Sequence, residues 1–453
     1  MFLKFLIAQA RAERWWPLAD GSCLCGPDLV VEQDGAPLAE RRGVAPFYRL
    51  AADGRLSTFE PPAPAERAPA PIALEWQTLP LAEARDDAGW RPIDGPQPLE
   101  ALGCYLGYGW YRAEIEVEHD QLTTLAAPWL ADRARVLVDG ADQGWLGVHP
   151  GGPQLALPLA LTAGRHELRL LADNLGRFNY GSNTGERKGL LDTLYWGGRQ
   201  IDISAGWVAL WQEAVFAGEA LAHAKPAFLR ADALDVDLGN FAFQGPSVWL
   251  LRTIDALPGR RYLLRMTGDR NPGALFVNGV ALARFSRHNG GGYVCADITA
   301  LLEPGENTLA LNILGYAGAH WRALLLEWDA GQALAARWSF RPGVTPEETK
   351  ELGHSALPPS PAFHRARFRY DSAEHGHGPF KLLLPGLRKG QIWLNGQNAG
   401  RYWQVGPQEA YKLPASWLRE DNELLILDEE GADPREASIA TDALGAERPL
   451  PLR

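Results

Sequence analysis

The sequence has 453 residues, 46% apolar and 22% charged, which is enough to bury several hydrophobic cores and too apolar for a disordered chain. Its formal net charge of −11, with no run among the 44 Lys and Arg, argues against nucleic acid as a partner. No apolar stretch approaches the roughly 20 residues that cross a bilayer, and the N-terminus lacks a convincing signal peptide, so we expect no membrane partner and a cytoplasmic or undetermined location.

Residues 1–60 are predicted to form a short helix followed by a small β-unit. Apolar residues recur at helical spacing from Phe2 to Trp16, which indicates one amphipathic helix over Met1–Trp16. From Ser22 the pattern changes to short alternating runs broken by two Asp-Gly pairs, which is a strong hairpin signal. Prolines and alanines are frequent in residues 61–75, and because proline cannot donate to a sheet ladder, we expect a linker there.

A pattern of strands occurs three times in the rest of the chain. In each copy, alternating apolar residues run into Asp-Gly or Asn-Gly, which suits a type I′ hairpin turn because these residues tolerate positive φ. The three hairpins are Ala134–Leu146, Gly273–Phe285 and Gly390–Trp403, each with an earlier strand and a later return strand. Such even spacing predicts an all-β fold of tandem jelly-roll sandwiches, over residues 76–206, 207–345 and 346–453.

Other chemistry is not indicated by the sequence. The four cysteines suit neither a disulfide framework nor a zinc site, so we expect buried free thiols. His375 and His377 lack a third metal ligand at recognisable spacing, and we predict no metal site. The sequence contains no Gly-x-Ser-x-Gly, His-Glu-x-x-His or Gly-x-Gly-x-x-Gly motif, and we expect no cofactor.

The third copy resembles the C-terminal sandwich of family 35 β-galactosidases. It continues over Trp393–Gly431 with Asn-Gly, Gly-Arg-Tyr-Trp, Gly-Pro-Gln, Tyr-x-x-Pro, Trp-Leu and Asn-Glu in the family's order. Ala172–Ile201 is similar to the family's Asn-x-Gly-Arg-x-Asn-Tyr-Gly segment, and Gly107–Arg112 resembles the start of a galactose-binding-like sandwich. The resemblance implies tandem galactose-binding-like jelly-roll sandwiches, with Met1–Trp16 as the last helix of a preceding catalytic barrel.

The resemblance assigns no catalytic residue to this chain. Family members hold two catalytic glutamates in the barrel. A retaining glycosidase needs these two carboxyl groups roughly 5 Å apart on one rigid scaffold. The acid/base of the family lies in an Asn-Glu pair, and the Asn-Glu of this sequence, Asn422-Glu423, falls on a predicted sandwich strand. We therefore expect the non-catalytic part of a β-galactosidase-like protein.

Two clusters are candidates for sugar binding, because sugars are held by aromatic faces together with amides, carboxylates or Arg. The first cluster lies beside the third hairpin and comprises Asn395, Asn398, Arg401, Tyr402, Trp403 and Gln404. The alternative is that Tyr402 and Trp403 pack between sandwiches while Arg401 pairs with a nearby carboxylate. The second lies in a predicted loop and comprises Arg177, Asn179, Tyr180, Asn183 and Lys188. In the family this loop lies towards the barrel, so it is a candidate for an interface as well as for sugar contact.

Three functions remain open from the sequence. The chain binds carbohydrate, with galactosides as the expected ligands, or acts as a scaffold. Alternatively, it is a subunit or fragment of a β-galactosidase that hydrolyses terminal β-galactosides when completed by a separate barrel chain. The expected protein partner is such a barrel chain or a second copy of this chain in a homo-oligomer. The third possibility is a structural interaction protein without sugar binding, because a fold does not fix a function.

Overall fold

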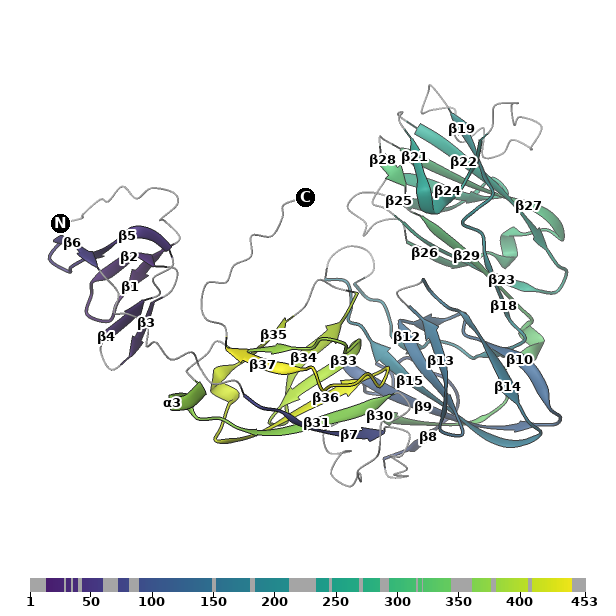
Figure 1. Cartoon of the computed structure of the whole chain (residues 1–453). Coiled ribbons are helices and arrows are strands. Elements are labelled where there is room, and N and C mark those ends of the chain that lie inside the picture. The colour runs from purple at the N-terminus through teal and green to yellow at the C-terminus, as the bar shows by residue number, and fades with distance from the viewer. Residues whose placement is uncertain are drawn as a thin grey trace. The chain divides into compact units, whose positions relative to one another are not determined.

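The computed structural model describes most of the chain as β-strands joined by short turns (Figure 1). Its contacts define two compact units, Met1–Ala84 with Pro346–Arg453, and Arg85–Thr345. The residues that the structure describes are 14–27, 30–33, 36–39, 43–59, 72–80, 89–148, 152–179, 184–211, 234–243, 247–268, 272–285, 293–314, 317–319, 321–343, 361–375, 380–405 and 410–441.

A four-stranded antiparallel sheet forms the first described part, in the order β1-β2-β5-β6. Trp15 and Trp16 lie in strand β1 and not in a helix, because Trp16 pairs with Leu24 and its indole Nε1 donates to the Pro27 carbonyl at 2.9 Å. The predicted helix is therefore wrong at its C-terminal end, and its remainder lies outside the described residues. The strands are β1 (Trp15–Pro17), β2 (Cys23–Pro27), β5 (Gly43–Leu50) and β6 (Leu56–Phe59), with a separate hairpin of β3 (Val30–Gln33) and β4 (Ala36–Ala39).

The first sandwich packs a six-stranded sheet, β13-β12-β15-β9-β30-β8, against a three-stranded sheet, β14-β10-β17. Their facing side chains form one buried core, which includes Tyr111, Val136 and Phe340. The strands are β8 (Arg91–Ile93), β9 (Gly107–Val117), β10 (Gln121–Ala126), β12 (Arg133–Val138), β13 (Ala141–Gly147), β14 (Ala156–Leu161), β15 (Gly164–Asn174), β17 (Tyr195–Trp196) and β30 (Arg337–Pro342), beside the short pair β11 (Leu130–Ala131) and β16 (Gly189–Leu190).

The second sandwich packs the sheet β18-β29-β23-β26 against the sheet β20-β19-β22-β27-β24-β25. Trp207, Tyr262 and Trp321 are buried in its core. The strands are β18 (Arg199–Asp202), β19 (Trp207–Trp211), β20 (Leu234–Val236), β22 (Ser247–Ala256), β23 (Arg261–Thr267), β24 (Gly273–Val277), β25 (Val280–Phe285), β26 (Val294–Asp297), β27 (Gly305–Leu314) and β29 (Arg322–Trp328), beside the pair β21 (Phe241–Phe243) and β28 (Ala317–Ala319).

The third sandwich packs the sheet β34-β33-β36-β31-β7 against the sheet β35-β32-β37. Phe380, Ile392 and Tyr402 are among its buried core residues. A one-turn helix, α3 (Ser372–His375), follows β31. The strands are β7 (Glu75–Pro80), β31 (Ala362–Arg369), β32 (Phe380–Leu383), β33 (Lys389–Leu394), β34 (Gln397–Trp403), β35 (Ala410–Leu413), β36 (Asp421–Asp428) and β37 (Ser438–Thr441).

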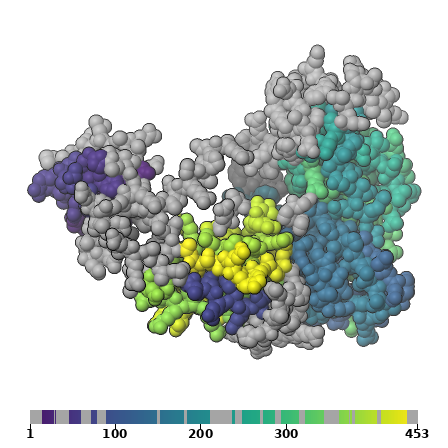
Figure 2. All heavy atoms as spheres, viewed as in Figure 1, coloured from purple at the N-terminus to yellow at the C-terminus, as the bar shows by residue number. Residues whose placement is uncertain are grey.

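Three strands depart from the sandwich boundaries that the sequence predicts. β7 pairs with β31 of the third sandwich and not with the first, and Figure 2 shows its dark-blue atoms against the green and yellow ones. β18 pairs with β29 of the second sandwich, and β30 returns to pair with β9 of the first. The second sandwich is thus inserted into the first, and strands of the third flank both in sequence. A strand's alternation shows that it pairs but not with which partner, which explains the difference.

The three predicted hairpins are confirmed, with the expected turn geometry. The first turn residues, Asp139, Asn278 and Asn395, have φ of 51°, 47° and 52°, and each is followed by a glycine with positive φ. Each hairpin also shifts register at one equivalent step of its first strand, at Val136/Leu137, Leu275/Phe276 and Ile392/Trp393. The sandwiches are therefore copies of one strand pattern.

Candidate functional site

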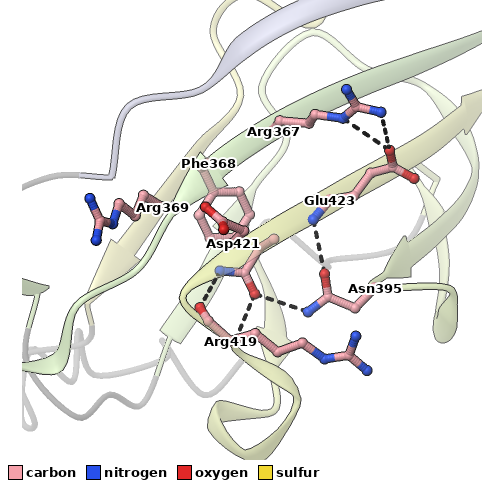
Figure 3. Close-up of a pocket in the computed structure, with 8 residues that line it drawn as sticks. Arg367, Phe368, Arg369, Asn395, Arg419, Asp421 and Glu423 are labelled. Atoms are coloured by element: carbon pink, nitrogen blue, oxygen red, sulfur yellow. Dashed lines mark hydrogen bonds and ion pairs between the residues drawn. The ribbon is translucent and has the colours of Figure 1, made fainter.

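A shallow pocket lies at one end of the third sandwich, where β31 and β36 meet the turn of the third hairpin (Figure 3). Two strands supply most of its wall, because Arg367 pairs with Glu423, Phe368 with Asn422 and Arg369 with Asp421 across the sheet. The lining residues are Arg367, Phe368, Arg369, Asn395, Arg419, Asp421, Asn422 and Glu423.

Hydrogen bonds between Asn395 and the return strand fix one side of the pocket. The Asn395 carboxamide donates to the Trp417 carbonyl at 2.8 Å and to Asn422 Oδ1 at 2.9 Å, and its own Oδ1 accepts from the Glu423 N–H at 2.9 Å. Asn422 in turn accepts from the Arg419 N–H at 2.9 Å and donates to the Arg419 carbonyl at 2.6 Å. These bonds hold the backbone that carries Arg419, Asp421 and Glu423, so the pocket wall is preorganised.

The pocket combines paired and unpaired charges. Arg367 approaches Glu423 at 3.4 Å, and Arg369 pairs with Glu420. The Arg419 guanidinium and the Asp421 carboxylate have no ion pair or side-chain hydrogen bond in the part of the chain that the structure describes. Figure 3 shows Arg367 and Arg419 on opposite sides of Glu423 and Asn395. A donor and an acceptor are thus available to a polar neutral ligand.

A second pocket occupies the equivalent position in the first sandwich. There Glu114 pairs with Glu167, Ile115 with His166 and Glu116 with Arg165, in the same register as in the third sandwich. Asp139 takes the place of Asn395 at the hairpin turn. The charges differ, however, because β9 carries Glu where β31 carries Arg. As in the third sandwich, arginines here pair with carboxylates, Arg165 with Glu116 at 3.1 Å and Arg337 with Glu114 at 2.6 Å.

One residue of the first predicted sugar-binding cluster, Asn395, lines the pocket, whereas the others lie along β34 or just beyond it. The Tyr402 hydroxyl is buried and donates to the Leu427 carbonyl or to Asp428 Oδ2, at 2.9 and 2.7 Å. Burial raises the pKa of Tyr402 well above its usual value, so the hydroxyl keeps its proton. Asn398 accepts from the Gly400 N–H two residues further along β34, and the Trp403 ring centroid lies 5.4 Å from the Lys389 ammonium.

The two remaining members of this cluster, Arg401 and Gln404, do not line the pocket. Arg401 is half-buried and makes further interactions, and the Gln404 side chain is exposed while its backbone N–H donates to the Arg388 carbonyl at 2.8 Å. The cluster therefore does not converge on one cavity. Tyr402 is buried in the core of the third sandwich, so it packs within one sandwich and not between two sandwiches, as the alternative had it.

The second predicted cluster surrounds a network of charges in the first sandwich. Lys188 is 2% exposed, and its ammonium lies 2.8 Å from Asp132 and 3.1 Å from Glu186. Arg177 pairs with Glu100, which also accepts from the Lys188 N–H at 3.1 Å. Asn179 is exposed, and Tyr180 and Asn183 lie outside the described residues. Lys188 and Arg177 are thus committed to the protein's own carboxylates.

Sequence reasoning missed most of the pocket in the third sandwich. Arg367 and Arg369 alternate with buried Phe368 and resemble any solvent face of a strand, and Asn422-Glu423 was considered only as a possible catalytic pair. The available signal was the repeat itself, since the turn residue and the return strand recur in all three copies.

The described residues offer no group of three or more His, Cys, Asp or Glu placed to hold a metal ion. All four cysteines are free thiols, and Cys25 and Cys104 are buried as expected, whereas Cys23 and Cys295 are half-buried. Burial raises the pKa of the Cys104 and Cys295 thiols, which makes them poor nucleophiles. None of the described helices is long and apolar enough to span a membrane.

Two family models match the chain. Residues 361–423 match the galactose-binding domain of β-galactosidase, and residues 96–208 match its first all-β domain. All eight residues that line the pocket of the third sandwich lie in the first of these matches.

The curated relatives of this chain are also β-galactosidases or β-galactosidase-like proteins. A β-galactosidase from Xanthomonas manihotis is 32% identical over 192 residues, covering 40% of this chain and 29% of that protein. The mouse β-galactosidase-1-like protein is 35% identical over 109 residues, covering 22% and 16%. Human β-galactosidase-1-like protein 2 is 42% identical over 65 residues, covering 14% and 10%. The chain thus spans less than a third of the length of these relatives.

Among solved structures, a β-glucuronidase from Bifidobacterium dentium aligns with 51% of this chain and 42% of its own, at 13% identity and a TM-score of 0.25. The two family models match strands of the first and third sandwiches described above. We conclude that this chain contains a non-catalytic, all-β region similar to that of β-galactosidases.

Proposed function

We propose that the chain binds carbohydrate, with β-galactosides as the ligand class, through the pocket of the third sandwich. The observation that carries the proposal is that this pocket lies wholly inside the segment that matches the galactose-binding domain model. The pocket also offers the Arg419 guanidinium and the Asp421 carboxylate, neither of which is engaged within the described part of the chain.

These groups suit sugar hydroxyls. A hydroxyl donates one hydrogen bond and accepts others, so a guanidinium and a carboxylate that line one pocket can each hold a sugar hydroxyl. The backbone on which they stand is fixed by Asn395 and Asn422, so little conformational entropy is lost on binding. The pocket is shallow and open, which favours a terminal sugar over an enclosed small molecule.

Isothermal titration of the full chain with methyl β-galactoside tests this proposal, with methyl β-glucoside as the epimeric comparison. Arg419→Ala and Asp421→Ala remove the two free groups without breaking a contact within the described residues. Arg435→Ala is the matched control, because Arg435 is exposed, lies in the same sandwich and pairs with Asp433 outside the pocket. We expect galactoside binding in the wild type and in the control. Equal binding by all four proteins would exclude this pocket.

A second function is favoured by the surface of the first sandwich. The loop of Glu100 and the loop of Arg177 are tied together by ion pairing and hydrogen bonding, and three large apolar side chains on them are exposed: Tyr105 at 64%, Leu106 at 86% and Phe178 at 45%. Exposed large apolar side chains are typical of interaction sites when they form one patch. We therefore also propose that these loops contact a catalytic barrel chain, which would make this chain part of a β-galactosidase.

Affinity capture from the native host tests this second function. The tagged full chain should retain a barrel-containing protein together with β-galactosidase activity. The double variant Leu106→Ser/Phe178→Ser should lose both, because its apolar contacts are removed while the Glu100 network stays intact. A variant that retains partner and activity in full contradicts the docking surface. The absence of both sugar binding and a partner would favour the structural role.

A further inference from the structure

The hairpin turn of each sandwich is held to the return strand by the same set of bonds. The N–H of Asp139, Asn278 and Asn395 donates at 2.8 Å to the carbonyl of Glu167, Thr308 and Glu423, respectively. The N–H of each of these three partners donates in return to Oδ1 of the turn residue, at 2.8 to 2.9 Å. We call this set of bonds the turn clamp.

A third contact also belongs to the turn clamp, because the remaining side-chain atom of the turn residue contacts the residue just before that partner. In the second and third sandwiches this contact joins two amides, Asn278 to Asn307 at 2.7 Å and Asn395 to Asn422 at 2.9 Å. In the first sandwich it joins Asp139 Oδ2 to His166 Nδ1 at 2.6 Å. The sequence separations are 29, 27 and 27 residues, so the three contacts occupy one position of the repeat.

The amide contacts are insensitive to protons, since each amide carries both a donor and an acceptor at any ordinary pH. The contact in the first sandwich differs, because His166 Nε2 also lies 2.8 Å from the Thr162 carbonyl. A carbonyl and a carboxylate both only accept, so both ring nitrogens need a hydrogen for the two bonds to exist together. Neutral His166 beside ionised Asp139 carries one hydrogen and can make only one of them.

Other charges around His166 do not replace that hydrogen. The neighbouring carboxylates favour the imidazolium, and the arginines are largely paired with them. The acidic groups are Asp120, which accepts from the Ala163 N–H, together with Glu114 and Glu116 of β9 and Glu167 of β15. The basic groups are Arg112 of β9, Arg165 and Arg169 of β15, and Arg337 of β30, and each of them pairs with one of these glutamates. The hydrogen bond to Asp139 is the largest cause of a raised pKa for His166, followed by that to Thr162.

We propose that the turn clamp of the first sandwich is a proton-dependent device that the other two sandwiches lack. With the His166 imidazolium present, the clamp ties the β12–β13 turn to β15 and to the Thr162 loop. Loss of one proton breaks either the Asp139 or the Thr162 bond, and the turn opens more often. The turns at Asn278 and Asn395 keep their bonds throughout. The pocket of the first sandwich includes Asp139 and His166, so its shape changes with the clamp.

Hydrogen exchange of the full chain, read by mass spectrometry between pH 5.5 and 9 and corrected for intrinsic exchange, tests the device. The protection of the peptide around Asp139 is divided by that of the peptides around Asn278 and Asn395, which serve as internal controls. We expect this ratio to fall about tenfold with rising pH, as for the loss of one charge-assisted hydrogen bond. A ratio that stays constant in the wild type overturns the proposal.

A paired substitution separates the clamp from other pH effects. Asp139→Asn/His166→Asn gives the first sandwich the amide pair of the other two, and its protection ratio should no longer depend on pH. His166→Asn alone should also lose the pH dependence, which supplies a second variant if the first folds poorly. A pH dependence in the double variant equal to that of the wild type would show that other groups cause it and would contradict the proposal.

Discussion

Replacing Tyr402 with Phe removes one hydroxyl from the interior of the third sandwich and leaves the ring in place. The hydroxyl is a donor to Asp428, whose carboxylate is fully buried. Asp428 keeps the N–H groups of Arg388, Glu430 and Ala432 as donors, at 2.9 to 3.0 Å. Losing a buried hydrogen bond to a charged acceptor costs about 1.5–3 kcal/mol, and no cavity term is added because Phe fills the ring's volume.

Urea unfolding of the third sandwich measures this cost as a lower midpoint for Tyr402→Phe. Tyr105→Phe is the control, because Tyr105 is 64% exposed and its hydroxyl should contribute little. The affinity for methyl β-galactoside should stay unchanged in both variants, since Tyr402 does not line the pocket. If Tyr402→Phe keeps the wild-type midpoint but loses galactoside binding, the structural assignment of Tyr402 is refuted and the residue contacts sugar.

Three further perturbations follow from buried groups. Lys188→Met leaves Asp132 and Glu186 without their shared cation and should lower the free energy of unfolding by about 3 kcal/mol in urea; an unchanged midpoint would contradict this. In Gly390→Ala the new Cβ would lie 1.7 Å from the Leu427 carbonyl oxygen, so we expect circular dichroism to show loss of the folded third sandwich. Gly386→Ala is the control, because a Cβ there meets no atom within 4 Å and the φ of +79° at this residue adds only backbone strain. Burial lowers the pKa of His364 to about 4, and Thr78 bonds its Nδ1 at 3.1 Å. Because unfolded His titrates near 6.5, stability should fall as the pH drops from about 6.5 to about 4, with a flatter pH profile in His364→Gln; equal slopes would disprove the linkage.

Local rules predicted the repeated hairpins well because their signals are local. Asp139, Asn278 and Asn395 precede glycines between alternating apolar runs, and the turn type depends on those few residues. Trp15 and Trp16 were mispredicted because their strand depends on pairing with Cys25 and Leu24, which helical spacing does not report. The insertion of the second sandwich into the first was not predicted, because β30 pairs with β9, which lies far away in sequence. The pairing of β7 with β31 was missed for the same reason.

The pocket was harder to predict than the fold. Its lining comes from residues 367–369, 395 and 419–423, which register and hairpin geometry bring together in space. In the sequence, Arg367 and Arg369 look like the solvent-exposed residues of an ordinary strand. Tyr402 and Trp403, in contrast, look like aromatic residues that stack on a sugar ring. The structure places Tyr402 in the core, because its hydroxyl finds a buried partner in Asp428.

Titration of the full chain with methyl β-galactoside at millimolar concentration, beside Arg419→Ala and Arg435→Ala, is the most direct test of sugar binding at the third sandwich. Binding should be seen for the wild type and Arg435→Ala and should weaken about tenfold or more for Arg419→Ala, as expected for the loss of a charge-assisted hydrogen bond. Absence of heat with the wild type, or equal affinity in Arg419→Ala, would contradict the account.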